Sequence, residues 1–200
     1  MTPSIVESFT LPSSAGILAD WLLHQDVQAH FVGGMIRDSL LKIETNDIDV
    51  AIEGNALIVG KAAASNLKGT YIELDRARGI CRVVVAGEKG FQADFVSANE
   101  GIEADLARRD FTIDSMAIDI ESVRTNEGEL SFTLSNLVDP LNGRGDLNSG
   151  KLRSVSSSSL ADDPIRLMRA VRLSSQYRLR LEDKTYNPVS YTHLTLPTKA

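Results

Sequence analysis

An acidic pair inside an apolar segment constrains this chain more than any other feature. Asp47 and Asp49 flank Ile48 and lead into the apolar residues 50–52, a pattern typical of a β-strand. Side chains two residues apart in a strand point to the same face, so we expect both carboxylates on one face. Paired carboxylates repel each other and lose hydration unless a positive charge lies between them. The pattern therefore predicts a site for a hard divalent cation such as Mg²⁺, with a turn beginning at Asn46 as the alternative.

A glycine pair before the acidic pair favours the first of these interpretations. Residues 31–41 have the pattern of a short apolar strand, then Gly33 and Gly34, then a helix. Glycines let a backbone approach a ligand closely, and the N–H groups at a helix start favour an anion. Arg37, one turn into the helix, would add a bidentate contact to a phosphate. A glycine pair alone is more often a tight turn, but beside the acidic pair it predicts a phosphate site next to a metal site.

The segment from Asp163 onward has the pattern of a helix rich in arginine. Asp163 is a favoured N-cap residue, and Pro164 is favoured at the first helical position. Three apolar residues at three-residue spacing predict the face toward the core, and three arginines offset by one position predict the lining of a cleft. A solvated basic face is the alternative, but arginines without an interspersed lysine favour bidentate recognition. The apolar residues are Ile165, Met168 and Val171, and the arginines are Arg166, Arg169 and Arg172.

Four segments, in order, resemble one known family. The run from Gly33 to Asp49 resembles the first motif of the class II tRNA nucleotidyltransferases and the related bacterial poly(A) polymerases, within the polymerase β-like nucleotidyltransferase superfamily. Residues 108–117 resemble the second motif, residues 138–155 the turn and hairpin that follow, and residues 162–172 the nucleotide-selecting helix. The resemblance extends from residue 30 to residue 183, and the order of the four matches is more specific than any single motif.

The resemblance implies an α+β fold, with a mixed sheet backed by helices and followed by the start of a helical neck. We expect a catalytic head over residues 1–155 and the first part of the neck over residues 156–185. Residues 186–200 contain two prolines and no apolar period, and we interpret them as a non-native tail. Family members continue into further helical domains that grip tRNA. We therefore expect this chain to bind Mg²⁺ and nucleotide but to add nucleotides poorly.

The resemblance also implies an activity and the residues that carry it. It implies transfer of C and/or A from CTP and ATP to the 3′ end of tRNA, with two Mg²⁺ ions held by Asp47 and Asp49. Asp94 falls where the superfamily has a third carboxylate, and Arg109 would contact ribose or phosphate. The protein template for the base would be Asp163 and Arg166, with Arg169 and Arg172 nearer the triphosphate and the helix surface.

Hydrogen-bond chemistry predicts which bases Asp163 and Arg166 would select. A carboxylate only accepts hydrogen bonds and a guanidinium only donates them. Cytosine and adenine each present an amino donor beside a ring-nitrogen acceptor, whereas uracil and guanine present a carbonyl and a ring N–H. The two side chains, one helical turn apart, therefore match C or A. A bound U or G would leave buried polar groups unpaired, which discriminates strongly against these bases.

Three segments depart from the family pattern. Asp114 and Ser115 stand where the family usually has Asn-Ala, Asp162 stands where it usually has Glu, and a serine run occupies residues 156–159. None of these positions is assigned to the chemistry. Asp114 adds negative charge near the second motif, and we expect this charge to weaken nucleotide binding.

Composition limits the possible partners. The chain has 21 basic and 27 acidic residues, which gives a net charge of −6. A self-sufficient RNA-binding surface needs clustered Lys and Arg, so we expect most tRNA contacts to lie outside this chain. The single cysteine, Cys81, excludes an internal disulfide and fits a reducing cytoplasm. No apolar run approaches the length of a membrane span, and we expect neither a membrane nor a DNA partner.

Alternatives remain within and outside the enzyme class. Addition of CCA, of CC only, of A only and of poly(A) share these motifs, so the sequence does not choose among them. A catalytically idle nucleotide- or RNA-binding module is the alternative from a different class. Six intact residues argue against this second alternative, because loss of catalysis is expected to remove a carboxylate first. They are Asp47, Asp49, Arg37, Arg109, Asp163 and Arg166.

Overall fold

The computed structural model describes most of the chain and divides it into two compact units. The first unit lies within Met1–Asp105 and Ala117–Val138, and the second lies within Leu106–Met116 and Asp139–Ala200. The expected boundary between head and neck at residue 155 falls inside the second unit and stays a prediction. The expected tail lies outside the described residues. The structure describes residues 8–87, 90–126, 129–156, 160, 164–183 and 185.

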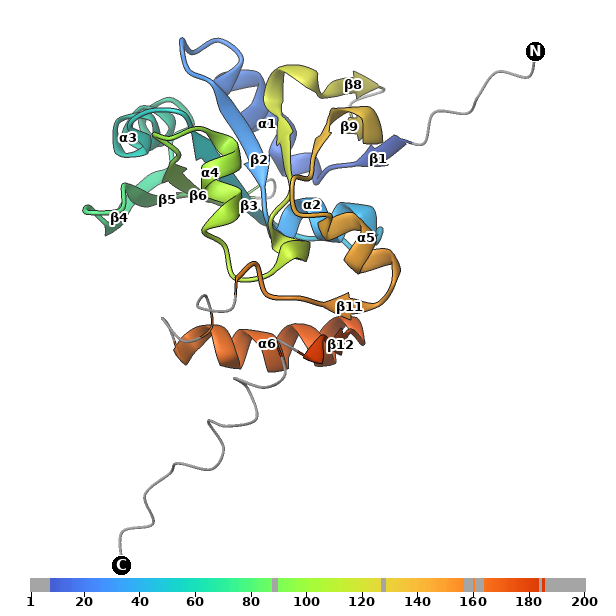
Figure 1. The fold of residues 1–200 in the computed structure, drawn as a ribbon. Helices are drawn as coiled ribbons and strands as arrows, with labels where there is room; N and C mark the ends of the chain where they lie inside the picture. Colours follow the sequence, from blue (N-terminus) through green and yellow to red (C-terminus); the bar gives the residue numbers. More distant parts are fainter. Residues whose placement is uncertain are drawn as a thin grey trace, which may run out of the picture. The chain divides into compact units, whose positions relative to one another are not determined.

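A mixed sheet forms the centre of the first unit (Figure 1). Strands β3 and β6 run parallel, and the other neighbouring strands of this sheet run antiparallel. A parallel pair needs a long crossover connection, which α3 and the β4–β5 hairpin supply. The expected α+β fold with a mixed sheet backed by helices is confirmed. Across the sheet the order is β10 (Leu137–Val138), β7 (Ala117–Asp119), β2 (Ala29–Val32), β3 (Asp47–Ile52), β6 (Phe91–Ser97), β5 (Ile80–Val85) and β4 (Thr70–Asp75).

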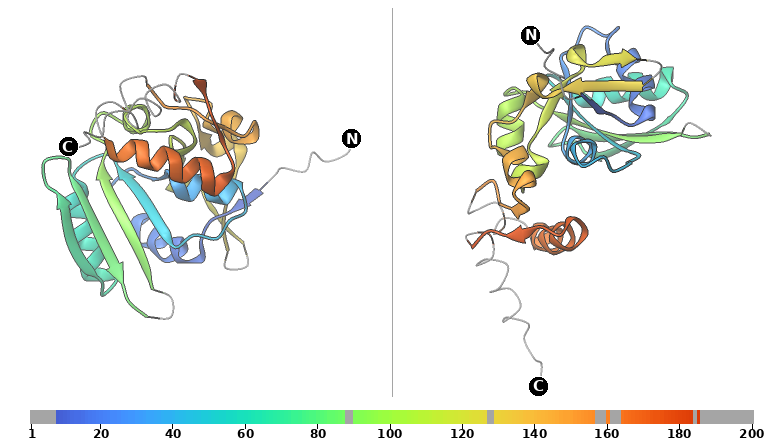
Figure 2. Two further views of the ribbon diagram at one scale, coloured as in Figure 1. Left: turned by 90° about the horizontal axis from the view of Figure 1, so that it is seen from below. Right: turned by 90° about the vertical axis from the view of Figure 1, so that its right-hand side faces the viewer.

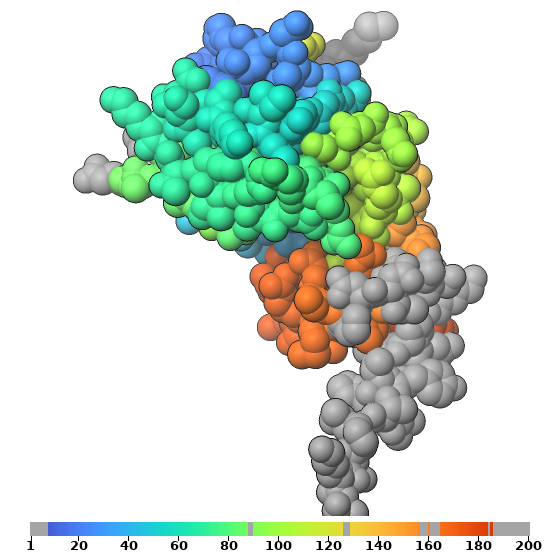
Figure 3. Space-filling model, turned by 90° about the vertical axis from the view of Figure 1, so that its left-hand side faces the viewer, coloured from blue at the N-terminus to red at the C-terminus, as the bar shows by residue number. Residues whose placement is uncertain are grey.

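The two faces of this sheet differ because apolar and polar residues alternate along its strands. Helix α3 (Ala56–Asn66) packs on one face of β4, β5 and β6 (Figure 2), and Figure 3 shows the surface that α3 and the β4–β5 hairpin present. Asn55 caps this helix, since its side-chain oxygen accepts two N–H groups of the first turn. Gly60 permits close packing, because a Cβ there would overlap the sulfur of Cys81. The buried residues on this face are Ile48, Val50, Ile52, Cys81, Val83, Ala93 and Phe95.

Two further helices and a smaller sheet belong to the first unit. Helix α1 (Ser13–Leu22) packs with one side toward the core, with Leu18 buried and Ile17 exposed. Helix α2 (Gly34–Leu40) is the expected helix after the glycine pair. Phe9 and Phe132 stack with their ring centroids 5.6 Å apart and join two strands of the smaller sheet. The smaller sheet has the order β1 (Ser8–Thr10), β9 (Glu129–Thr133) and β8 (Arg124–Asn126), and the 3₁₀ turns are η2 (Ile120–Ser122) and η3 (Leu134–Asn136).

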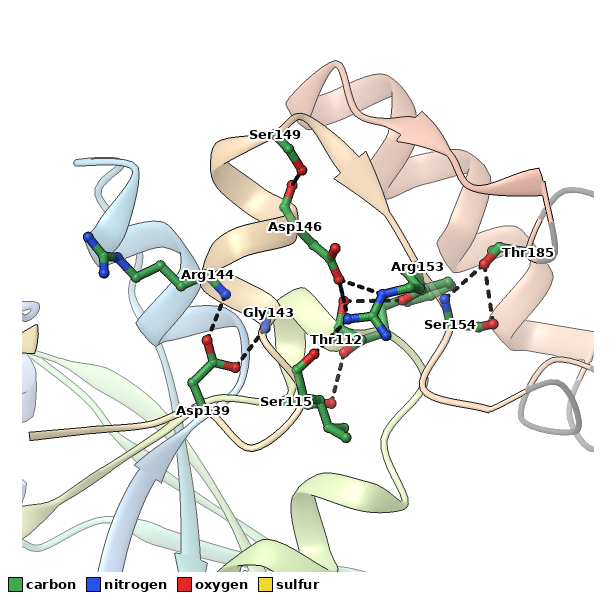
Figure 4. A network of polar contacts seen from close by, with 12 residues as sticks. Thr112, Ser115, Asp139, Gly143, Arg144, Asp146, Ser149, Arg153, Ser154 and Thr185 are labelled. Atoms are coloured by element: carbon green, nitrogen blue, oxygen red, sulfur yellow. Dashed lines mark hydrogen bonds and ion pairs between the residues drawn. The ribbon is translucent and has the colours of Figure 1, made fainter.

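A network of polar contacts organises the second unit (Figure 4). The carboxylate of Asp146 accepts hydrogen bonds from Thr112 Oγ1 at 2.6 Å and from Arg153 Nε at 2.8 Å. Arg153 Nη2 also donates to the carbonyl of Leu141 at 2.6 Å, and Asp139 accepts the first two N–H groups of α5. The network therefore ties η1 to α5 and β11. Helix α4 (Ile102–Ala107) leads the chain into this unit, which contains η1 (Thr112–Asp114), α5 (Gly143–Asn148), β11 (Lys151–Leu152), α6 (Pro164–Tyr177) and β12 (Arg180–Leu181).

The rotation of helix α6 corrects one prediction. The helix begins at Pro164 as expected, but the stripe expected to face the core is exposed, with 68% of Ile165 and 70% of Met168 accessible. Ala170 and Leu173 are the buried positions instead. The prediction failed because strict three-residue spacing drifts around a helix, whereas a core-facing stripe alternates three- and four-residue steps.

None of the helices in the described part of the chain combines the length and the apolar character that a membrane span requires.

Candidate functional site

The acidic pair lies at the start of β3, on the sheet face that α3 does not cover. Asp47 is exposed and Asp49 is half-buried, whereas Ile48 and Val50 between and after them are buried on the opposite face. This alternation confirms the predicted strand with both acids on one face. Oxygen ligands in this arrangement suit Mg²⁺, which proteins usually hold with one or two carboxylates.

Asp94 lies beside the acidic pair through the register of the sheet. It is the direct partner of Asp49 in the parallel pairing of β3 and β6, and neighbouring strands are about 4.8 Å apart. Both of its carboxylate oxygens accept hydrogen bonds from Arg82, at 2.6 Å from Nε and 2.7 Å from Nη2. In the described part of the chain, no three His, Cys, Asp or Glu side chains converge as a metal site. The role of Asp94 as a third metal ligand therefore stays a prediction.

Arg82 is the residue of this face that the sequence reasoning missed. Its pKa lies above the ordinary value, mainly because Asp94 accepts its hydrogen bonds, and the negative charges of Asp94, Asp47 and Asp49 raise it further. The available signal was a charged residue inside the apolar run of β5. Alternation alone placed Arg82 on a face, but only the strand register shows that it lies opposite Asp94.

The glycine pair forms the turn between β2 and α2. Gly33 has φ 73° and ψ −137°, a backbone conformation that residues with a Cβ rarely adopt. Phe31 of β2 pairs with Val50 of β3, so this turn follows directly after the strand that adjoins the acidic pair. A Cβ on Gly34 would lie 3.2 Å from Nη2 of Arg37, so the guanidinium packs against the turn.

Arg37 is almost fully buried. Only 6% of its surface is accessible, and its Nε donates to Asp38 Oδ1 at 2.9 Å. Gly33, Gly34 and Arg37 therefore lie together beside the acidic pair, as the sequence pattern predicted. Phosphate binding by these three residues stays a prediction.

The arginines of the second unit contact the second motif. Arg109 Nη1 donates to the carbonyl of Asp114, and Arg166 Nη2 donates to the carbonyl of Arg108, each at 3.4 Å. The predicted base contact of Arg166 stays a prediction, and its expected partner Asp163 lies outside the described residues. Arg172 is exposed on α6.

Arg169 contacts two carboxylates of the second motif. Its Nε donates to Asp110 Oδ2 and its Nη2 donates to Asp114 Oδ2 at 3.3 Å, and its expected place near a triphosphate stays a prediction. Both carboxylates are buried, with 4% of Asp114 accessible. The additional charge of Asp114, expected to weaken nucleotide binding, therefore has a cationic partner within the second unit.

Comparisons with known proteins identify a matching family and similar relatives. The family described as the poly(A) polymerase head domain matches residues 29–153. A CC-adding tRNA nucleotidyltransferase of Geobacter sulfurreducens is 36% identical over 179 residues, which are 89% of this chain and 38% of that protein. An A-adding tRNA nucleotidyltransferase of Halalkalibacterium halodurans is 34% identical over 171 residues, 78% of this chain and 37% of that protein. The chain thus spans less than two fifths of these relatives.

A solved structure shares the fold. A tRNA nucleotidyltransferase complexed with a primer tRNA and an incoming ATP analog matches with a TM-score of 0.66 and 27% identity. The match covers 90% of this chain and 50% of that one.

Proposed function

We propose, from the premise that this chain belongs to the poly(A) polymerase head-domain family, that it carries the catalytic centre of a cytoplasmic tRNA nucleotidyltransferase. The enzyme would add C and/or A from CTP and ATP to the 3′ end of tRNA. The relatives named for CC and A addition, and the neighbour bound to tRNA and an ATP analog, support this choice of substrates. The buried free thiol of Cys81 supports the reducing compartment.

The shared face of Asp47 and Asp49 is the observation that carries this proposal. These two carboxylates would hold Mg²⁺, with Asp94 of the neighbouring strand as a third ligand. Bound there, Mg²⁺ would supply the charge stabilisation that two-metal nucleotidyl transfer needs at the attacking 3′-hydroxyl and the departing pyrophosphate. Gly33 and Gly34 would let the triphosphate approach the backbone beside these acids.

The remaining predicted residues would bind the nucleotide. Arg37 and Arg109 would contact phosphate or ribose. Arg169 and Arg172 would lie nearer the triphosphate and the helix surface. Arg166 with Asp163 would select C or A through the pairing edge of the base. The choice among CCA, CC, A and poly(A) addition would depend on the whole protein. The named relatives are more than twice as long as this chain.

Replacing Asp49 with Ala tests the proposal. In the incorporation assay, an excess of the chain is incubated with tRNA that lacks its 3′ CCA, with labelled CTP or ATP and with Mg²⁺. In a separate binding assay, the affinity for CTP is measured in Mg²⁺ and in EDTA. We expect slow, Mg²⁺-dependent incorporation by the wild type and none above background by Asp49→Ala, because this variant loses a metal ligand. Asp20→Ala, which removes an exposed carboxylate of α1, is the matched control and should retain both signals.

Three results would decide against this assignment. Equal incorporation by Asp49→Ala and wild type would indicate a different site. Metal-dependent CTP binding without incorporation would indicate an idle nucleotide-binding module. Nucleotide binding that ignores both Mg²⁺ and the Asp49 substitution would remove the basis of the assignment.

A further inference from the structure

Three residues form a row across the sheet face that α3 does not cover. Asp49 of β3 is the register partner of Asp94 of β6, and Asp94 is the register partner of Arg82 of β5. Direct cross-strand partners have Cβ atoms about 5 Å apart, and their side chains share a face. The row therefore places one guanidinium beside the carboxylates that would bind a metal.

Arg82 engages Asp94 through both carboxylate oxygens. The two hydrogen bonds, at 2.6 and 2.7 Å, are a bidentate pair of the strongest kind. Each side chain is about one third accessible, so the pair lies at the edge of solvent where a hydrated ion can reach it. Asp94 thus has a cationic partner before any metal arrives.

The same oxygens cannot serve two cations without cost. A divalent ion bound by Asp49 and Asp94 would face a guanidinium at hydrogen-bond distance from its ligand. At the surface of a protein, two cations this close repel each other less strongly than in a dry interior but more strongly than in water. Either the guanidinium leaves Asp94 or the ion binds weakly.

We propose that Arg82 is a positioning residue that neutralises Asp94 in the metal-free protein and releases it when a divalent cation binds. This inference rests on the proposed function, since it takes Asp47, Asp49 and Asp94 as the ligands. In the metal-free protein, Arg82 reduces the repulsion among the carboxylates of this face. When Arg82 leaves, Asp94 becomes available as the third ligand. The cation and the guanidinium are alternative partners of one carboxylate.

A Mn²⁺ titration of the chain, followed by electron paramagnetic resonance with Mg²⁺ as competitor, tests the competition. Arg82→Gln should bind Mn²⁺ on the order of tenfold more tightly than wild type, because the competing charge is gone. Arg82→Lys, which keeps the charge but lacks the fork, should lie between the two. Arg76→Gln, which removes an arginine paired with Glu73 on the exposed β4–β5 hairpin, is the matched control and should bind like wild type.

Nuclear magnetic resonance of the arginine side chains tests the release directly. The Nε–H signal of Arg82, assigned by its loss in Arg82→Gln, should shift and lose its protection from solvent exchange when Mg²⁺ saturates the wild type. The Nε–H signal of Arg76 should not change.

The outcomes separate this inference from the proposed function. Unchanged or weaker Mn²⁺ binding by Arg82→Gln would overturn the competition and would indicate a brace that holds Asp94 for the metal. An Arg82 signal unchanged at saturation would overturn the release. If Asp49→Ala abolishes Mn²⁺ binding in the same titration, the metal site stands even when the inference on Arg82 fails. If Asp49→Ala binds as wild type does, both fail.

Discussion

Arg169 shows how one residue can hold a sequence motif in place. Its guanidinium lies between Asp110 and Asp114, which belong to the second motif and are both buried. Two buried carboxylates without a cation would carry a large desolvation cost, so a partly exposed arginine is the simplest compensation. The contact fixes α6 against η1 within the second unit.

We expect Arg169→Ala to destabilise the second unit by about 2–4 kcal/mol. This loss is smaller than that of a fully buried ion pair, because 39% of the arginine side chain is accessible to solvent. Hydrogen exchange of the amides of α6 and η1 would measure the loss. Arg172→Ala, which removes an exposed arginine of the same helix, should leave the exchange unchanged. Equal effects of the two substitutions would contradict the buried role of Arg169.

At the scale of secondary-structure elements, local pattern and distant partners determined different parts of the structure. Strand β3 and the shared face of Asp47 and Asp49 follow from alternation within six residues, and were therefore predictable. The rotation of α6 was not, because its arginines take partners more than fifty residues earlier in the chain. The pair of Arg82 and Asp94 likewise needs the strand register, which no local pattern supplies.

The packing of α5 on η1 depends on the absence of one side chain. A Cβ on Gly143 would overlap the carbonyl oxygen of Thr112 and lie 2.8 Å from its carbonyl carbon. The obstacle is backbone held by the polar network around Asp146, so it cannot move aside at low cost.

Gly143→Ala should therefore lower the free energy of unfolding by about 1–3 kcal/mol or more, as overpacking does. Gly16→Ala in α1 is the control with the opposite sign, since a Cβ there meets nothing within 4 Å and Ala favours a helix. Urea denaturation followed by circular dichroism would compare the two. A harmless Gly143→Ala would show that α5 and η1 do not pack as closely as described.

At the scale of the whole molecule, the net charge limits how tightly this chain can bind RNA. The chain carries 21 basic and 27 acidic residues, and several arginines are occupied by carboxylates of the chain itself. A net charge of −6 opposes the binding of a large RNA, because neutralisation of its phosphates supplies most of the affinity in such complexes.

We expect this chain to bind tRNA no more tightly than a Kd of about 1 μM at physiological salt, the range of non-specific binding. Fluorescence anisotropy with labelled tRNA, repeated with duplex DNA of similar charge, would measure the affinity and any preference for RNA. Nanomolar affinity for tRNA would contradict this expectation and would show that the chain contains its own RNA-binding surface.

The single parallel strand pair of the large sheet determines when Asp49 and Asp94 can come together during folding. Asp49 and Asp94 meet only because β6 returns beside β3 after the helix and hairpin between them. An N-terminal stretch of the polypeptide that ends before β6 cannot bring these acids together, however stable its strands are. During synthesis, the row of Asp49, Asp94 and Arg82 can therefore assemble only after the ribosome has released the chain as far as the end of β6 at Ser97.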